Sequence, residues 1–163
     1  MQKKSRTTST IFWAGIAGGT VEVVWVALFC LFSPLQSSLV AEEVARSFSP
    51  QMMGMPAVAA GLIIHYALAV LVAGMFAMTL MRWLGQRKDM RSVIGMSATA
   101  LAAIWAINFF VILPLVNASF VTLMPYAVTL ASKLGFGVAM GWVFGIRAGV
   151  STGHAAHSRF ALR

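Results

Sequence analysis

Acidic side chains are scarce in this sequence. Only four of the 163 residues are Asp or Glu, twelve are Lys or Arg, and charged residues make up 10% of the chain against 60% for hydrophobic ones. An ordinary soluble domain is about one-quarter charged, so this composition excludes a typical soluble enzyme and indicates a membrane protein. The net charge of +8 lies beside apolar stretches, which favours lipid-headgroup contact over nucleic-acid binding.

The motifs of common catalytic and cofactor sites are also missing. The one cysteine, Cys30, cannot form an internal disulfide, and the chain has no CxxC pair, haem-attachment motif, glycine-rich phosphate loop or GxSxG elbow. We therefore expect no catalytic residue, no metal site and no cofactor, and we predict that the chain is not an enzyme. His154 and His157 lie in a basic tail, which we interpret as a solvated end rather than a metal site.

Long apolar stretches dominate what is present. Crossing about 30 Å of hydrocarbon takes roughly 20 helical residues, and four stretches reach that length. The first is longer than the core of a typical signal peptide, so we expect it to be retained as a span. The sequence thus predicts one all-α transmembrane domain, a four-helix bundle with spans at about 11–32, 57–81, 92–116 and 126–146.

Basic residues gather at alternate ends of these spans. They precede the first span, separate the second from the third and follow the fourth, whereas the other two loops contain one basic residue, Arg46. By the positive-inside rule, we predict that the N-terminus, the middle loop and the basic tail at 147–163 are cytoplasmic, in a bacterial-type inner membrane. Trp13, Trp83 and Trp142 fall near the predicted cytoplasmic ends, where indole rings favour the headgroup layer.

The first outer loop, from residue 33 to residue 55, contains a short amphipathic pattern. Its apolar residues at helical spacing are Leu39, Val40, Val44 and Phe48. The opposite face would carry Glu42, Glu43 and Arg46. We predict a short surface helix at the outer membrane interface, and a substrate gate or a partner-docking element is the alternative interpretation.

One strongly polar residue interrupts each predicted span. In chain order these are Glu22, His65, Asn108 and Lys133. Counted from the outer end of each span, all four lie about 10 to 15 Å deep, so they can form one layer. An ionisable group at such depth costs about 3 kcal/mol, so the four should face the bundle interior. We predict an ion pair between Glu22 and Lys133, with hydrogen bonds to it from His65 and Asn108.

This buried polar layer has two interpretations. It could fix the order and rotation of the helices, or it could be a proton or ion relay or a polar substrate site, because buried Glu, His and Lys mark transport pathways. Trp25, Tyr66 and Trp105 lie near the same level and are candidates to line it. Haem ligation by His65 is a less favoured alternative, since a four-helix cytochrome normally shows two or more such histidines.

Glycines repeat every four positions in the first and fourth spans. They are Gly15 and Gly19 in the first, and Gly137, Gly141 and Gly145 in the fourth. Such faces let helix backbones approach closely, because glycine has no side chain to hold them apart. We predict that they pack inside the monomer, and a dimer seam is the alternative.

The glycine-rich first span with its buried acid, the His65-Tyr66 pair and the proline-bounded third and fourth spans resemble small uncharacterised four-helix integral membrane proteins of bacteria. That resemblance implies a fold and a location, and no catalytic residue. The acid in the first of four helices is also similar to that of small multidrug-resistance transporters, which use it for drug and proton exchange. This chain departs from them in its length, its first outer loop and the presence of Lys133 and His65.

Two function classes follow from these patterns. The favoured hypothesis is an accessory or structural subunit that packs in a larger membrane complex, with lipid, other membrane subunits or further copies of the chain as partners and no nucleic acid. The alternative is a small transporter or proton-coupled permeation protein centred on Glu22 and Lys133. What co-purifies in mild detergent would separate the two.

Overall fold

The computed structural model describes residues 2–83 and 89–147, and every regular element in these ranges is a helix. The four long helices are α1 (Gln2–Leu31), α3 (Gly54–Trp83), α4 (Met90–Ile107) and α7 (Tyr126–Arg147). A π-helical turn, η1 (Asn108–Ile112), continues α4 into α5 (Leu113–Val116). Two short helices, α2 (Ser37–Arg46) and α6 (Ala118–Leu123), occupy the remaining loops. The predicted tail with His154 and His157 lies outside the described residues, as does the side chain of Trp83.

The predicted four-span fold is confirmed. The segments long and apolar enough to cross a membrane are Thr7–Leu31, Gly54–Thr79, Met90–Val116 and Tyr126–Arg147. Large apolar side chains cover their outward faces, as with Ile63 at 70% and Leu115 at 84% exposure. A soluble monomer rarely exposes such a surface, whereas lipid covers it in a bilayer and each helix satisfies its own backbone hydrogen bonds.

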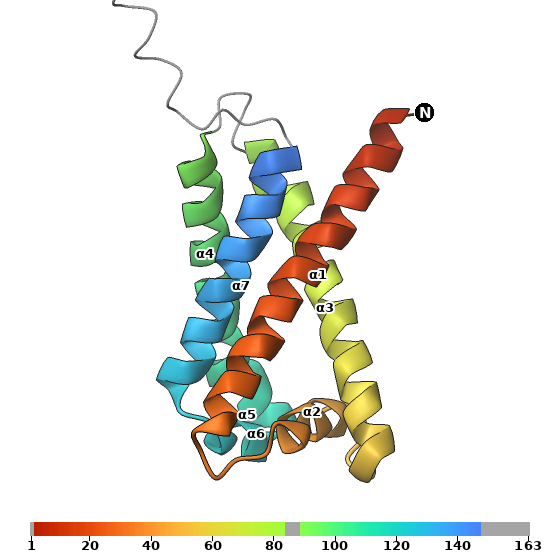
Figure 1. The fold of residues 1–163 in the computed structure, drawn as a ribbon, viewed down its shortest axis with the longest axis vertical. Coiled ribbons are helices and arrows are strands. Elements are labelled where there is room, and N and C mark those ends of the chain that lie inside the picture. Colours follow the sequence, from red (N-terminus) through yellow and green to blue (C-terminus); the bar gives the residue numbers. More distant parts are fainter. Residues whose placement is uncertain (1, 84–88, 148–163) are drawn as a thin grey trace, which may run out of the picture.

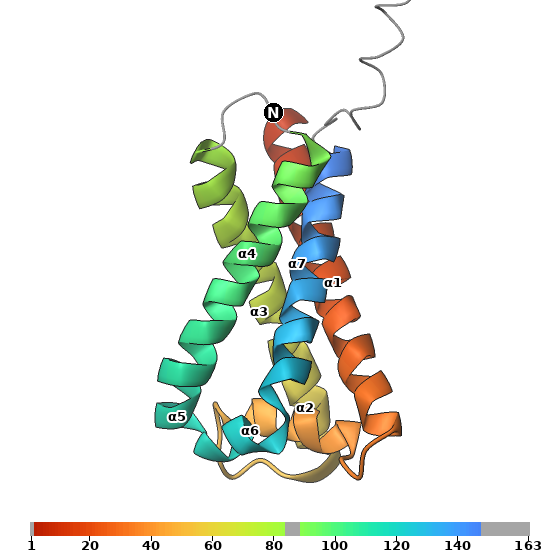
Figure 2. The ribbon, with the colours of Figure 1, turned by 90° about the vertical axis from the view of Figure 1, so that its left-hand side faces the viewer.

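The helices are not arranged in a closed ring. α1 begins and α7 ends at one end of the bundle, which we call the inner end after the charge pattern, and α2 and α6 lie at the opposite, outer end (Figure 1). α1 packs against α3 and α7, and α7 packs against α4, but α3 and α4 barely touch. The spatial order is therefore α3, α1, α7, α4 (Figure 1), and Figure 2 shows α7 between α4 and α1. We call the boundary between α3 and the α4–η1–α5 helix the open seam.

Small residues bring α7 against α4. A Cβ added to Gly137 would lie 2.6 Å from the Cα of Ala98, and one added to Gly141 would lie 2.8 Å from the Cα of Ile94. Ser97 is buried in this contact and its hydroxyl donates to the Gly137 carbonyl at 2.7 Å. The close approach explains why this face of α7 carries no larger residue.

The other glycines of the two repeats act in the same way. Gly145 lies against the side chain of Met90 at the start of α4, and a Cβ on Gly15 would lie 2.6 Å from the Cα of Val70 on α3. Gly19 lies one turn further along the same contact with α3. Both glycine faces therefore lie against neighbouring helices of the same chain.

The third span contains the π-helical turn. The Leu113 amide donates to the Asn108 carbonyl, five residues earlier. Pro114 accounts for this change of pitch, because proline has no N–H and its ring clashes with the carbonyl four residues earlier, that of Phe110. Single π-helical turns often mark functional sites, and Asn108 is the first residue of this one.

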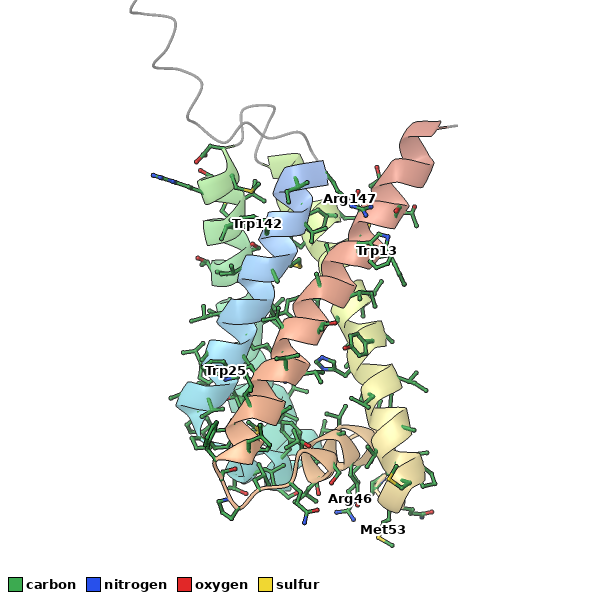
Figure 3. All side chains as sticks on the ribbon, in the orientation of Figure 1. Trp13, Trp25, Arg46, Met53, Trp142 and Arg147 are labelled. Atoms are coloured by element: carbon green, nitrogen blue, oxygen red, sulfur yellow. The ribbon has the colours of Figure 1, made fainter. Side chains whose placement is uncertain are left out.

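The inner end carries features expected at a membrane surface. Trp13 and Trp142 are about half exposed, at 50% and 55%, and lie near Arg147 (Figure 3). Asp89 caps α4 by accepting a hydrogen bond from the Ser92 amide. A second hydrogen bond, from the Ser92 hydroxyl, is the main cause that lowers the pKa of the Asp89 carboxyl. Arg46 and Met53 lie at the opposite end (Figure 3).

Candidate functional site

A cavity of about 590 Å³ lies in the outer half of the bundle. Its walls come from α1, α3, η1, α5 and α7, and residues of α2 and α6 cover its outer end. Most of the lining side chains are apolar. The four polar residues that the sequence singles out, one in each span, all line it: Glu22, His65, Asn108 and Lys133. The structure therefore brings the predicted layer together around one space.

The predicted ion pair is present in the cavity wall. The Lys133 Nζ lies 2.6 Å from the Glu22 Oε1 and donates to the Glu22 Oε2 at 2.8 Å. Their side chains are 22% and 12% exposed, so both charges are largely removed from solvent. The ammonium also lies 5.8 Å from the centre of the Phe136 ring, one helical turn further along α7. Each charge depends on the other at this depth, because an unpaired one would bear the full desolvation cost.

The predicted hydrogen bonds from His65 and Asn108 to this pair are wrong. The Nε2 of His65 instead lies 3.2 Å from the backbone carbonyl of Gly19. Within residues 2–83 and 89–147, the Asn108 side chain has no hydrogen-bond partner, and it lines the cavity half-buried. Sequence spacing gives the depth of a residue in the membrane but not the distance between residues on different walls of a cavity. His65 and Asn108 share the depth of the ion pair without forming a hydrogen bond to it. The Asn108 amide is left facing the cavity, where a ligand could meet it.

The aromatic residues predicted as lining do not line the cavity. Trp25 is 44% exposed on the outside of the bundle (Figure 3), and its Nε1 donates to the Val128 carbonyl of α7 at 3.0 Å. The hydroxyl of Tyr66 lies 3.2 Å from that of Thr20 on α1. Both side chains therefore connect neighbouring helices from outside the cavity.

Trp105 does not line the cavity but contacts two residues that do. It is buried, its Nε1 donates to the hydroxyl of Thr129 at 3.0 Å, and it stacks on Phe109 with ring centres 5.5 Å apart. Thr129 and Phe109 both line the cavity. Trp105 thus holds two lining side chains in place, one on α7 and one on η1.

The helix α2 covers the outer end of the cavity. Val40, Ala41 and Val44 contribute to the lining, and Val40 is buried. Gly61 on α3 permits this position, because a Cβ there would overlap the Ala41 carbonyl. The loop in which the sequence predicts a surface helix therefore holds one that packs into the bundle and forms part of the site.

The position predicted for Glu43 is wrong. Its side chain does not lie on a solvated face but is 9% exposed, between α2 and the start of α6. Asn117 Nδ2 donates to its Oε2 at 3.0 Å, Ser119 Oγ donates to the same oxygen at 3.3 Å, and Arg46 pairs with its Oε1 at 2.9 Å. Asn117 and Ser119 come from the last outer loop, so the charge pattern of α2 alone could not reveal their contact with Glu43.

Sequence reasoning also missed the role of Asn117. Its side chain caps α6 by accepting from the amide of Phe120, and an asparagine before a short polar and apolar run is a recognisable capping signal. The amide nitrogen then remains for Glu43. No such local signal exists for the pairing itself.

Within the described residues, no three His, Cys, Asp or Glu side chains are grouped closely enough to hold a metal ion. The polar groups that line the cavity are one ion pair, one imidazole, one amide and the hydroxyl-bearing residues Ser37, Ser38, Ser47, Thr129 and Ser132, and the other lining residues are apolar. The chain matches no known protein-family model, no characterised protein and no solved structure.

Proposed function

We propose that this membrane protein is a small transporter that binds an amphipathic molecule in the cavity, in a bacterial-type inner membrane. One observation carries the proposal. The four polar residues that interrupt the four spans all line a single cavity of about 590 Å³ whose other walls are mainly apolar. Small-molecule sites commonly have volumes of roughly 300 to 1,000 Å³ and combine apolar walls with a few polar groups.

The ion pair gives the site a means of accepting a charged headgroup. A cationic ligand can replace the ammonium of Lys133 beside Glu22, and an anionic ligand can replace the carboxylate of Glu22 beside Lys133. In either exchange the charge that contacts the ligand keeps a partner, and the desolvation cost falls on the displaced group alone, which must turn towards solvent. His65 and Asn108 add hydrogen-bonding groups on the other walls.

The open seam supports access from the lipid phase. The lining includes large apolar side chains that are more than one-third exposed, on both sides of the seam. These are Leu62 and Leu68 on α3, and Ile112 and Val116 on the other side. An amphipathic molecule partitions into the bilayer first, so a lateral path between apolar side chains suits it better than a path through water.

Two probes of equal size and opposite charge test this proposal. Tetraphenylphosphonium and tetraphenylborate are titrated into the purified full chain in a neutral detergent, and binding is measured by equilibrium dialysis. Glu22→Gln leaves Lys133 unpaired, so it should weaken binding of the cation and strengthen that of the anion, each by about tenfold. Lys133→Met should have the opposite effect.

The control variant is Trp25→Phe, which keeps the cavity lining intact because Trp25 lies outside it. Its dissociation constants for both probes should equal those of the unmodified protein. Charge preference that is unaltered in both Glu22→Gln and Lys133→Met would contradict the proposal, because the probes would then bind elsewhere.

The accessory subunit favoured by the sequence remains the second candidate, and the same seam is the observation that favours it. A partner helix could fill the space between α3 and α4, which barely touch. Purification in mild detergent followed by mass determination separates the candidates. A stoichiometric partner that blocks probe binding supports the subunit, whereas probe binding by the isolated chain supports the transporter.

A further inference from the structure

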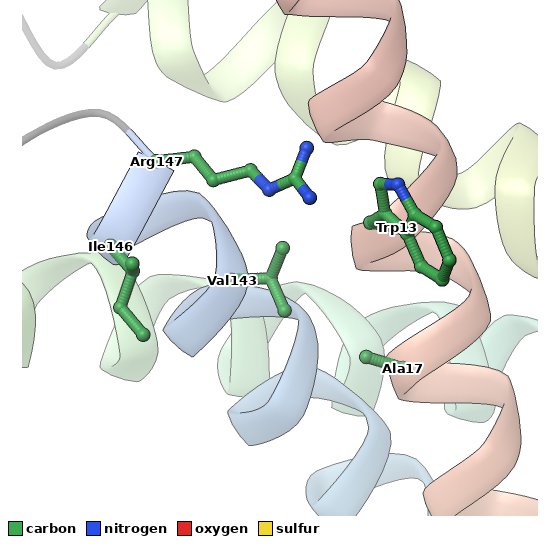
Figure 4. Close-up of a pocket in the computed structure, with 5 residues that line it drawn as sticks. All are labelled: Trp13, Ala17, Val143, Ile146 and Arg147. Carbon is green, nitrogen blue, oxygen red and sulfur yellow. The ribbon is translucent and has the colours of Figure 1, made fainter.

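A second hollow lies at the inner end, far from the cavity. It is a groove of about 260 Å³ between α1 and α7, lined by Trp13, Ala17, Val143, Ile146 and Arg147 (Figure 4). The Arg147 side chain extends from the end of α7 towards α1, on the side where Trp13 lies (Figure 4). The guanidinium of Arg147 is therefore the one charged group among the residues that line this groove, and the others are apolar or aromatic.

Arg147 has spare binding capacity. One of its nitrogens donates to the hydroxyl of Ser9 at 3.0 Å, and a guanidinium has five N–H donors in all. No carboxylate lies within ion-pair distance of it among residues 2–83 and 89–147. The acids of the chain are engaged elsewhere, since Glu22 pairs with Lys133, Glu42 and Glu43 pair with Arg46, and Asp89 caps α4.

We propose that this groove binds an anionic phospholipid. The phosphate would lie against the guanidinium of Arg147 and the hydroxyl of Ser9, which together offer a charge-assisted contact. The first part of an acyl chain would lie along Ala17, Val143 and Ile146. Half-exposed Trp13 lies where an indole favours the headgroup layer, and basic pockets between transmembrane helices are suited to acidic headgroups.

The position of Arg147 in the fold supports lipid over other anions. Arg147 is the last residue of α7, so its guanidinium is placed at the membrane boundary. The other four lining residues are apolar or aromatic and would gain nothing from a small inorganic anion. The groove lies at the opposite end of the bundle from the ion pair, so this proposal does not depend on the transporter function.

Lipid binding to the purified full chain tests the proposal. Phosphatidylglycerol and phosphatidylcholine with identical acyl chains are titrated in a neutral detergent, and bound lipid is counted by native mass spectrometry. Arg147→Gln should weaken phosphatidylglycerol binding by about tenfold and phosphatidylcholine binding less, because the choline ammonium already offsets the phosphate charge of that lipid. The matched control is Arg91→Gln, which removes one exposed basic charge at the same end on α4. It should change binding less than twofold.

A second variant separates the groove from general surface charge. Ala17→Leu fills the groove without altering any charge, so it should also lower phosphatidylglycerol occupancy, while a thermal unfolding curve shows that the variant is folded. Equal losses in Arg147→Gln and Arg91→Gln, or full binding by Ala17→Leu, would overturn the proposal. Displacement of the lipid by millimolar inorganic phosphate would also overturn it, because it would identify a simple phosphate site.

Discussion

The ammonium of Lys133 lies 2.6 Å from the carboxylate of Glu22 and joins α7 to α1 within the wall of the cavity. A buried ion pair that served packing alone could be replaced by apolar side chains of similar volume with little loss of stability. The pair instead adjoins a space large enough for a small molecule. This location of the pair is the observation that supports the proposed ligand binding.

Removing one charge of the pair should destabilise the protein. In Glu22→Gln the ammonium of Lys133 is left without its partner, and we expect a loss of about 3 kcal/mol in the free energy of unfolding. Reversible unfolding in mixed detergent micelles measures it. Arg91→Gln, an exposed charge, should change the same quantity by less than about 0.5 kcal/mol. Similar effects of the two changes would show that Glu22 is well solvated.

The contact between α7 and α4 should not tolerate a large side chain. Gly141→Leu forces the helices apart, because a Cβ alone would lie 2.8 Å from the Cα of Ile94. We expect loss of the folded monomer in size-exclusion chromatography. Gly95→Ala is the control on α4, since a Cβ there meets nothing within 4 Å, and it should stabilise the helix by up to about 1 kcal/mol. A normal yield of folded Gly141→Leu would show that these helices pack differently.

Gly61 should hold α2 over the cavity. In Gly61→Ala the new methyl group overlaps the Ala41 carbonyl, so α2 must move away from α3. Amide hydrogen exchange across Ser37–Arg46 should become faster, and bound tetraphenylphosphonium should dissociate faster. Gly74→Ala, on the same helix, adds a methyl group at an ordinary distance of 3.7 Å from Ile11 and should change neither rate. Unchanged exchange in Gly61→Ala would refute the role of α2 as a cover.

The basic residues predict the orientation of the chain in the membrane. Reporter fusions should place residue 85 and the C-terminal end in the cytoplasm, and residue 45 outside, because Lys and Arg near a span are retained on the cytoplasmic side. A cytoplasmic reporter at residue 45 would reverse the orientation and move the cavity to the other half of the bilayer.

The spans and the ion pair could be predicted from sequence because both depend on local quantities. Twenty apolar residues match the bilayer, and the depths of Glu22 and Lys133 follow from counting residues along each helix. The glycine faces could also be predicted, because glycines repeated every four residues lie on one side of a helix.

The cavity itself could not be predicted. The cavity depends on the open seam, on the π-helical turn before Pro114 and on the cover formed by α2. None of these features follows from helical periodicity. The rotation of each helix about its axis could not be predicted either. Trp25 and Trp105 therefore do not line the cavity, although their predicted depth in the membrane matches it. Glu43 was misplaced because Asn117 and Ser119 lie more than 70 residues further along the chain.

One measurement tests the central claim, that the pair serves ligand binding in the cavity. The double variant Glu22→Gln with Lys133→Met strands no charge, so its stability should recover most of the loss shown by either single variant. Its binding of tetraphenylphosphonium and tetraphenylborate, measured on the same sample, should lose the dependence on charge that the two single variants show in opposite directions. Recovered stability with no charge preference is the result that this account predicts. Losses of stability that simply add, or probe affinities equal to those of the unmodified protein, would contradict it.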